Sequence, residues 1–232
     1  MQRRNSFSLN ALWGNKIAVL VGDYLLSRGL LLSLENNAFK LLQITSKAVK
    51  EMSEGELLQL AKARRLDIEE DIYFKIIRKK TASLIAAACS AGASSTGADE
   101  ETVEKMRLFG EKIGIAFQIR DDLFDFGDGQ AGKPQGNDLQ EKKMTLPLIH
   151  ALNQSTKRRR GQIINIIKNQ NTDPVKIKEV VEFVQQSPGI DYAKEQMKKY
   201  QAEALNILSE FPDNQAKECM IELIHYVTER KK

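Results

Sequence analysis

The chain has 232 residues, of which 42% are hydrophobic and 28% are charged, and its formal net charge is +4. This length supports one globular domain with a sizeable core, and so small a positive excess does not indicate a nucleic-acid-binding protein. Cys89 and Cys219 show no metal-ligand spacing, so we expect two buried free thiols in a reducing compartment. No apolar leader follows Met1, and we expect a cytoplasmic protein.

The longest apolar run covers residues 17–34 and contains Asp23 and Arg28. Either charge would cost a few kcal/mol at the centre of a bilayer, so we expect no transmembrane segment. We predict instead a helix that is buried in the core of the domain. A buried Asp23 would then need a polar partner.

Helical spacing of apolar residues continues through residues 38–50 and 55–63, and an acidic run at 67–71 suits the start of a further helix. The helix predicted over residues 72–91 is rich in alanine and serine. Such small side chains permit close packing of helices, or they leave space for a chain-like ligand. Turn-forming residues at 92–97 predict a loop after this helix.

Residues 101–126 are predicted to form one amphipathic helix. At about 100° per residue, Gln118, Asp121, Asp122 and Asp125 share one arc of this helix. Like charges at this spacing repel each other, and the negative partial charge at a helix C-terminus disfavours anions. We therefore expect a positive group beside these aspartates.

A hard divalent cation suits the aspartates, because Mg²⁺ takes oxygen ligands and is often shared between one or two carboxylates and the phosphates of a substrate. The segment that follows supplies Lys133, Lys142 and Lys143, together with Asp138. An acidic helix face beside lysines is what a metal-bridged diphosphate needs. The alternative interpretation is a solvated polar helix end followed by a turn.

The rest of the chain is predicted to be helical over residues 174–186, 190–209 and 213–230. A basic run at 157–160 would suit contact with an anionic membrane or RNA, but we prefer to interpret it as a solvated helix start. No stretch alternates as a strand would, and the sequence has no nucleotide-binding glycine loop and no internal repeat. The fold class is therefore predicted to be all-α, with a single domain over residues 1–232.

Several motifs resemble one family. Residues 115–126 (IAFQIRDDLFDF), followed by GK at 132–133 and GNDL at 136–139, resemble the second aspartate-rich region of trans-polyprenyl diphosphate synthases. Residues 10–16 and 22–27 resemble the helix after the family's first aspartate-rich motif, and residues 80–82 (KTA) resemble its allylic diphosphate clamp. The similarity is greatest to long-chain members, such as the octaprenyl diphosphate synthases that make quinone side chains. A medium-chain or geranylgeranyl synthase is the alternative.

The resemblance implies an isoprenoid synthase bundle of helices around a central cavity, usually assembled as a homodimer. It also implies Mg²⁺-dependent condensation of isopentenyl diphosphate with an allylic diphosphate. Asp121, Asp122 and Asp125 would hold Mg²⁺, and Asp138 would orient a metal-bound water. Asp121, Asp122, Lys80 and Lys133 are the catalytic residues that the resemblance implies. The residues that it assigns to substrate binding are Arg3, Arg4, Lys80, Thr81, Gln118, Lys133 and Lys143.

The family's first D-D-x-x-D motif precedes the arginine pair, and nothing before Arg3 resembles it. We expect a truncated sequence, in preference to a complete chain that has lost one metal-binding wall. In either case the chain on its own is expected to have little or no activity. The alternative function is a non-catalytic prenyltransferase subunit that acts as an interaction partner.

Overall fold

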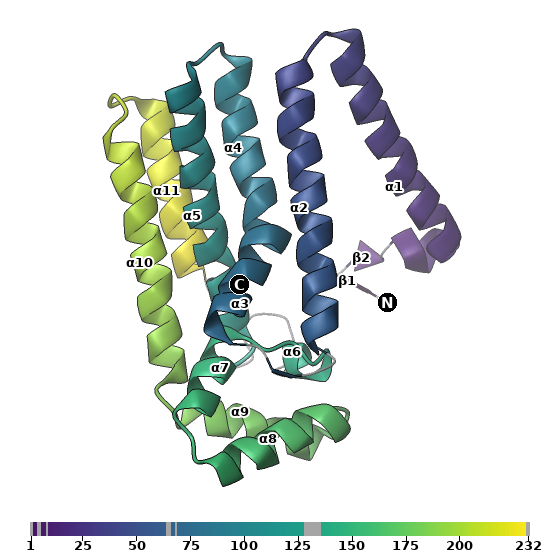
Figure 1. Ribbon diagram of the computed structural model, residues 1–232, viewed down its shortest axis with the longest axis vertical. Coiled ribbons are helices and arrows are strands. Elements are labelled where there is room, and N and C mark those ends of the chain that lie inside the picture. The colour runs from purple at the N-terminus through teal and green to yellow at the C-terminus, as the bar shows by residue number, and fades with distance from the viewer. Residues whose placement is uncertain are drawn as a thin grey trace.

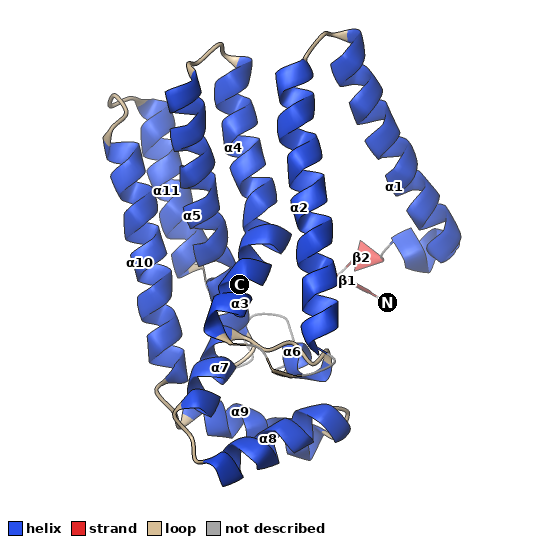
Figure 2. Cartoon of the chain, viewed as in Figure 1, coloured by secondary structure: helices blue, strands red, loops and turns tan. Residues whose placement is uncertain are grey.

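The computed structural model describes residues 2–3, 6–7, 9–63, 66–67, 69–127 and 136–230, and these are almost entirely helical (Figure 1 and Figure 2). The predicted all-α fold class is confirmed. In chain order the helices are α1 (Leu9–Glu35), α2 (Phe39–Ala63), α3 (Glu70–Ile77), the π-helix η1 (Arg78–Ala82), α4 (Ser83–Ser95), α5 (Glu100–Phe124), α6 (Asn137–Gln140), α7 (Leu146–Asn153), α8 (Lys157–Asn169), α9 (Pro174–Gln185), α10 (Gly189–Ser209) and α11 (Gln215–Glu229).

No strand was predicted from the sequence, but β1 (Gln2–Arg3) pairs with β2 (Ser6–Phe7) in an antiparallel arrangement. Strands of two residues are too short to show an alternating pattern. They form a small hairpin that leads into α1 and leave the fold class unchanged.

Side chains that cap the first turn explain where several helices begin. The carboxylate of Asp99 accepts a hydrogen bond from the backbone N–H of Thr102 at 2.7 Å, at the start of α5. Asp173 caps α9 in the same way, and Pro174 follows at a position where a missing N–H leaves no partner unsatisfied. These starts depend on local residues, so the sequence alone indicates them.

Two of the predicted helix ends were placed at the wrong residues. The loop predicted at 92–97 is mostly helix, because α4 continues to Ser95, whose hydroxyl donates to the carbonyl of Gly92 at 2.8 Å. Gly97, with φ of 77°, then ends the turn. The predicted helix at 101–126 ends earlier, at Phe124, and Asp125 is the residue that caps it.

The centre of the molecule is α5, which packs against α4 on one side and α10 on the other, with α2 beyond α4 (Figure 1). Helix α3 continues through η1 into α4, and α7, α8 and α9 close the lower end in the view of Figure 1. The contact between α4 and α5 is close: a Cβ added to Gly110 would lie 2.7 Å from the Cα of Ala86. The small side chains of α4 therefore serve close helix packing along this contact.

Helix α1 is not the buried core helix that the sequence analysis predicted. It packs mainly against α2, and large apolar side chains such as Trp13, Leu20 and Leu25 are exposed. Asp23 is also exposed and does not need the polar partner that burial would have demanded. Hydropathy alone could not show this, because an apolar run is equally compatible with a core and with a surface that another chain covers. By length and composition, residues Asn10–Glu35 would also reach across a membrane, a criterion that core helices of soluble proteins satisfy too.

The two cysteines are free, but only one lies where it was predicted. Cys89 is half-buried in α4, and burial raises the pKa of its thiol to about 11. Cys219 is exposed on α11, because that residue lies on the outward face of the helix. The prediction that Cys219 is buried was therefore wrong.

Candidate functional site

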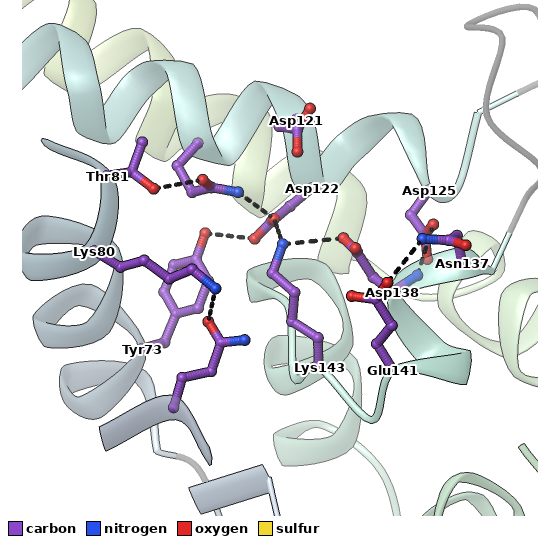
Figure 3. Close-up of polar contacts among 12 residues, drawn as sticks. Tyr73, Lys80, Thr81, Asp121, Asp122, Asp125, Asn137, Asp138, Glu141 and Lys143 are labelled. Carbon is purple, nitrogen blue, oxygen red and sulfur yellow. Dashed lines mark hydrogen bonds and ion pairs between the residues drawn. The ribbon is translucent and has the colours of Figure 1, made fainter. Parts of the chain in front are cut away.

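Gln118, Asp122 and Asp125, near the C-terminal end of α5, contact residues of η1, α3 and the segment from 136 to 143 (Figure 3). Ile115, Ile119 and Leu123 form the buried face of α5, and Asp122 lies close to that face. Asp122 is fully buried and Asp125 is 6% exposed, whereas the side chain of Asp121 is 27% exposed. The three aspartates that were predicted to share one arc therefore lie in different environments.

Asp122 accepts three hydrogen bonds from side chains. The hydroxyl of Tyr73 donates to Oδ2 at 2.8 Å, Nε2 of Gln118 donates to Oδ1 at 3.0 Å, and Nζ of Lys143 donates to Oδ1 at 2.7 Å. Thr81 donates to Oε1 of Gln118 at 2.9 Å, so the contacts run from α3 to α5 and back to η1. These donors favour the ionised carboxylate, but burial outweighs them and raises the pKa of Asp122.

The positive charge that the aspartates were expected to need is supplied by Lys143. Its ammonium lies between Asp122 and the carboxylate of Asp138, at 2.7 Å and 3.1 Å. Burial by itself would lower the pKa of Lys143, but the charges of Asp122 and Asp138 outweigh burial and raise that pKa. Lys143 therefore stays positively charged between Asp122 and Asp138.

Asp125 is the aspartate with spare coordinating capacity. Its Oδ1 accepts from the backbone N–H of Asp138 at 3.2 Å, whereas no hydrogen-bond partner for its buried Oδ2 is found among the described residues. Burial, and then the nearby charge of Asp138, raise the pKa of Asp125 to about 7. A buried carboxylate oxygen without a donor is a suitable ligand for a cation.

Asp121 lies apart from the hydrogen-bonded network of Figure 3. Its Oδ1 is 3.7 Å from Nη2 of Arg230, at the end of α11. Arg120 holds the end of α11 in place, because its Nη2 and Nε donate to the backbone carbonyl of Arg230 at 2.6 Å and 3.1 Å. No role for Arg230 was predicted from the sequence, because these contacts join residues more than a hundred positions apart.

Lys80 lies beside the network, in the π-helix η1, and is held by two residues of α2. Its Nζ is 2.6 Å from a carboxylate oxygen of Glu56 and 3.2 Å from Oε1 of Gln59. Gly55 permits this approach, since a Cβ there would lie 2.6 Å from the backbone nitrogen of Lys80. Glu56 and Gln59 were not predicted from the sequence, although a glycine followed by polar residues one helical turn apart was a usable signal. π-helical turns are frequent at functional sites.

The structure thus brings together Thr81, Gln118, Asp122 and Lys143, with Lys80 and Asp125 nearby. Lys133, Arg4 and the side chain of Arg3 lie outside the described residues. The roles predicted for these residues stay predictions.

The donor chemistry suits Mg²⁺ in part. Among the described residues, no group of three or more histidine, cysteine or acidic side chains is arranged to hold a metal. However, Mg²⁺ usually takes one or two carboxylates and completes its shell with water and substrate phosphates. One oxygen of Asp125 has no hydrogen-bond partner within the described part of the chain, and Asp121 is partly exposed. These two carboxylates therefore suit a metal that is held jointly with a diphosphate.

Cavities lie near the network and away from it. A cavity of about 20 Å³ is lined by Gln59, Tyr73 and Lys143, among others. A larger one of about 250 Å³ lies between α2, α4 and α5 and is lined by none of the predicted site residues. Its rim carries ion-paired charges such as Arg107 and Glu111, whereas the predicted site residues gather at the buried polar network around Asp122.

Comparison with known proteins agrees with the resemblance seen in the motifs. A sequence model described as polyprenyl synthetase matches residues 1–184. Heptaprenyl diphosphate synthase component 2 from Geobacillus stearothermophilus is 34% identical, and octaprenyl diphosphate synthase from Escherichia coli is 33% identical. Each alignment covers 98% of this chain and 71% of the relative.

Solved structures show the same likeness in three dimensions. A decaprenyl diphosphate synthase from Rhodobacter capsulatus superposes with a TM-score of 0.92 at 33% identity, over 100% of this chain and 72% of that one. A geranylgeranyl pyrophosphate synthase from Bacteroides thetaiotaomicron gives a TM-score of 0.86 at 39% identity, over 95% and 73%.

Proposed function

Since the chain belongs to the polyprenyl synthetase family, we propose that it joins isopentenyl diphosphate to an allylic diphosphate with the help of Mg²⁺ and makes a long-chain polyprenyl diphosphate. In this reaction the C1–O bond of the allylic substrate breaks and diphosphate leaves. The double bond of isopentenyl diphosphate then forms the new C–C bond to the allylic carbon, and a proton is lost. The observation that carries the proposal is the buried network of Asp122, Lys143 and Asp138 next to Lys80.

The described residues suit the task of stabilising a leaving diphosphate. An ammonium group has three N–H donors, and Lys143 uses one on Asp122 and one on Asp138, which leaves one for a phosphate oxygen. Lys80 adds a second cation from η1, and the neighbouring Thr81 donates to Gln118, which in turn donates to Asp122. Bound Mg²⁺ would neutralise charge that develops on the diphosphate.

The remaining assignments follow the family resemblance. We propose that Asp121, Asp122 and Asp125 face the metal, that Arg3, Lys80, Lys133 and Lys143 neutralise the allylic diphosphate, and that Arg4 meets isopentenyl diphosphate. Asp138 would orient a metal-bound water.

For product length we propose a long chain of the octaprenyl type, suited to a quinone side chain. Relatives are named hepta-, octa- and nonaprenyl diphosphate synthases, and a similar structure is a decaprenyl diphosphate synthase. Geranylgeranyl pyrophosphate synthases are also among the similar structures, so a shorter product is the competing proposal.

Helix α1 supports a proposal on assembly. Its exposed leucines, Trp13 and Tyr24 form an apolar surface on a helix that packs mainly against α2, and we propose that a second copy of the chain covers it. The alternative is a different subunit, because relatives at 34% and 29% identity are named component 2 of a heptaprenyl diphosphate synthase.

We also propose a cytoplasmic location, since free thiols are typical of a reducing compartment.

Binding and turnover are measured separately to test the function. Calorimetry with farnesyl diphosphate should show binding that depends on Mg²⁺ and weakens at least tenfold in Asp121→Ala, but not in the surface control Asp191→Ala, whose side chain is 86% exposed. Binding that is indifferent to both Mg²⁺ and Asp121→Ala would overturn the proposal. In a version of the protein supplied with a D-D-x-x-D motif before Arg3, labelled isopentenyl diphosphate and chromatography of the lipids then give the product length, whereas the chain on its own is expected to make little or no product. Binding without synthesis in the supplied version favours the non-catalytic subunit.

The assembly proposal has its own test in sedimentation velocity. Leu25→Glu should convert a dimer to a monomer, because Leu25 is 63% exposed on α1, whereas Val175→Glu, at 74% exposed on α9, should leave the dimer intact. A wild-type monomer that pairs with no second copy would reject the homodimer.

A further inference from the structure

Tyr73 is a buried residue of α3 to which neither the motifs nor the proposed reaction assigns a role. It is 2% exposed and packs edge-to-face on Phe74, with ring centroids 5.3 Å apart. Its hydroxyl donates to Oδ2 of Asp122 at 2.8 Å, across 49 positions of sequence. A phenolic hydroxyl carries its proton near neutral pH, so it is the donor in this bond and the carboxylate is the acceptor.

The contact determines how the carboxylate of Asp122 is oriented. A carboxylate offers about four lone-pair positions. Lys143 and Gln118 both use Oδ1, and Tyr73 uses Oδ2. Because rotation of a carboxylate about its terminal torsion is soft, the Tyr73 donor on the second oxygen is what keeps the first oxygen directed at Lys143 and Gln118.

The effect extends beyond Asp122. Gln118 donates its amide N–H to Asp122, which directs its amide oxygen toward the hydroxyl of Thr81. Figure 3 shows this path from Tyr73 through Asp122 and on to Thr81, with Lys143 branching from Asp122. Lys143, on the branch, is proposed to neutralise the allylic diphosphate, and Thr81, at the far end of the path, is one of the residues assigned to substrate binding.

We propose that Tyr73 is a positioning residue for diphosphate binding and acts through Asp122. The inference rests on the proposed function, and it adds a residue whose part in binding is indirect. Tyr73 need not touch the substrate. Its hydroxyl orients Asp122, and Asp122 in turn orients Lys143 and Gln118.

The test is a double-mutant cycle on the affinity of the chain for farnesyl diphosphate in the presence of Mg²⁺, measured by calorimetry. Tyr73→Phe removes only the hydroxyl and should weaken binding three- to tenfold. In the Asp122→Asn background the same change should weaken binding less than twofold, because the partner through which Tyr73 acts has already been altered. An equal loss in both backgrounds would mean that Tyr73 acts in some other way, and the inference would fail.

Tyr192→Phe is the matched control. It also removes a tyrosine-to-carboxylate hydrogen bond, here to Glu70, and so tests the general effect of losing such a bond. We expect the two variants to lower the midpoint temperature of thermal unfolding by similar amounts. The affinity for farnesyl diphosphate should fall only in Tyr73→Phe. Both are assayed well below that midpoint, with circular dichroism confirming the fold.

The outcomes separate the inference from the proposed function. Wild-type protein that binds no diphosphate with Mg²⁺ rejects both. Wild-type binding together with unchanged affinity in Tyr73→Phe rejects only the role of Tyr73.

Discussion

Asp125 gives the sharpest prediction, because it is acidic and buried, and one of its carboxylate oxygens has no hydrogen-bond partner in the part of the chain that the structure describes. We consider Asp125→Asn, which keeps the shape of the side chain and removes its charge. The amide oxygen can still accept from the backbone N–H of Asp138, which lies 3.2 Å from Oδ1 in the wild type. The change therefore isolates the cost of burying a charge beside Asp138.

The magnitude follows from the raised pKa. A rise from 3.8 to about 7 corresponds to roughly 4 kcal/mol, at about 1.4 kcal/mol per pH unit. The folded state holds the proton more tightly than the unfolded state. The free energy of unfolding therefore falls as the pH rises from about 4 to about 7, and the whole cost is present above pH 7.

We expect Asp125→Asn to raise the free energy of unfolding of the metal-free protein by about 2 to 4 kcal/mol at pH 8, with little change near pH 4. Urea denaturation followed by circular dichroism measures both values. With Mg²⁺ and pyrophosphate present at pH 8, the order should reverse, because only the wild type gains a ligand at Asp125.

The exposed Asp191→Asn serves as the control and should change stability by less than about 0.5 kcal/mol at either pH. A variant that is no more stable than the wild type at pH 8 without metal would refute the reasoning. It would show that Asp125 is not a strained buried charge.

Two further changes test the packing around the site. Gly55→Ala should destabilise the protein by about 1 to 3 kcal/mol in urea denaturation, and weaken diphosphate binding, because the new Cβ would lie 2.6 Å from the backbone nitrogen of Lys80. Gly22→Ala, where nothing lies within 4 Å of the new Cβ, should instead stabilise by roughly 0.5 to 1 kcal/mol from helix propensity, and equal effects at the two glycines would contradict the close approach at Gly55. Ile119→Ala empties a fully buried position of α5 and should cost about 2 to 5 kcal/mol in the same assay, whereas a loss below about 1 kcal/mol would show that the core is not packed as described.

The family resemblance and most helices could be predicted from the sequence, since both depend on residues close together in the chain. Asp99 and Asp173 cap helices through contacts within three residues, so the caps are visible as sequence patterns. The helix that carries Asp121, Asp122 and Asp125 was predicted from spacing alone, with an error of two residues at its end.

Only the tertiary structure decided which of these residues meet. Tyr73 reaches Asp122 over 49 positions and Lys143 reaches it over 21, and no local pattern encodes such pairings. The same holds for α1, whose apolar residues indicate a need for burial but do not show what buries them. Spacing determines which side chains share a face of a helix, whereas burial depends on the neighbours that the fold packs against that face. For this reason three aspartates on one predicted arc came to occupy three different environments.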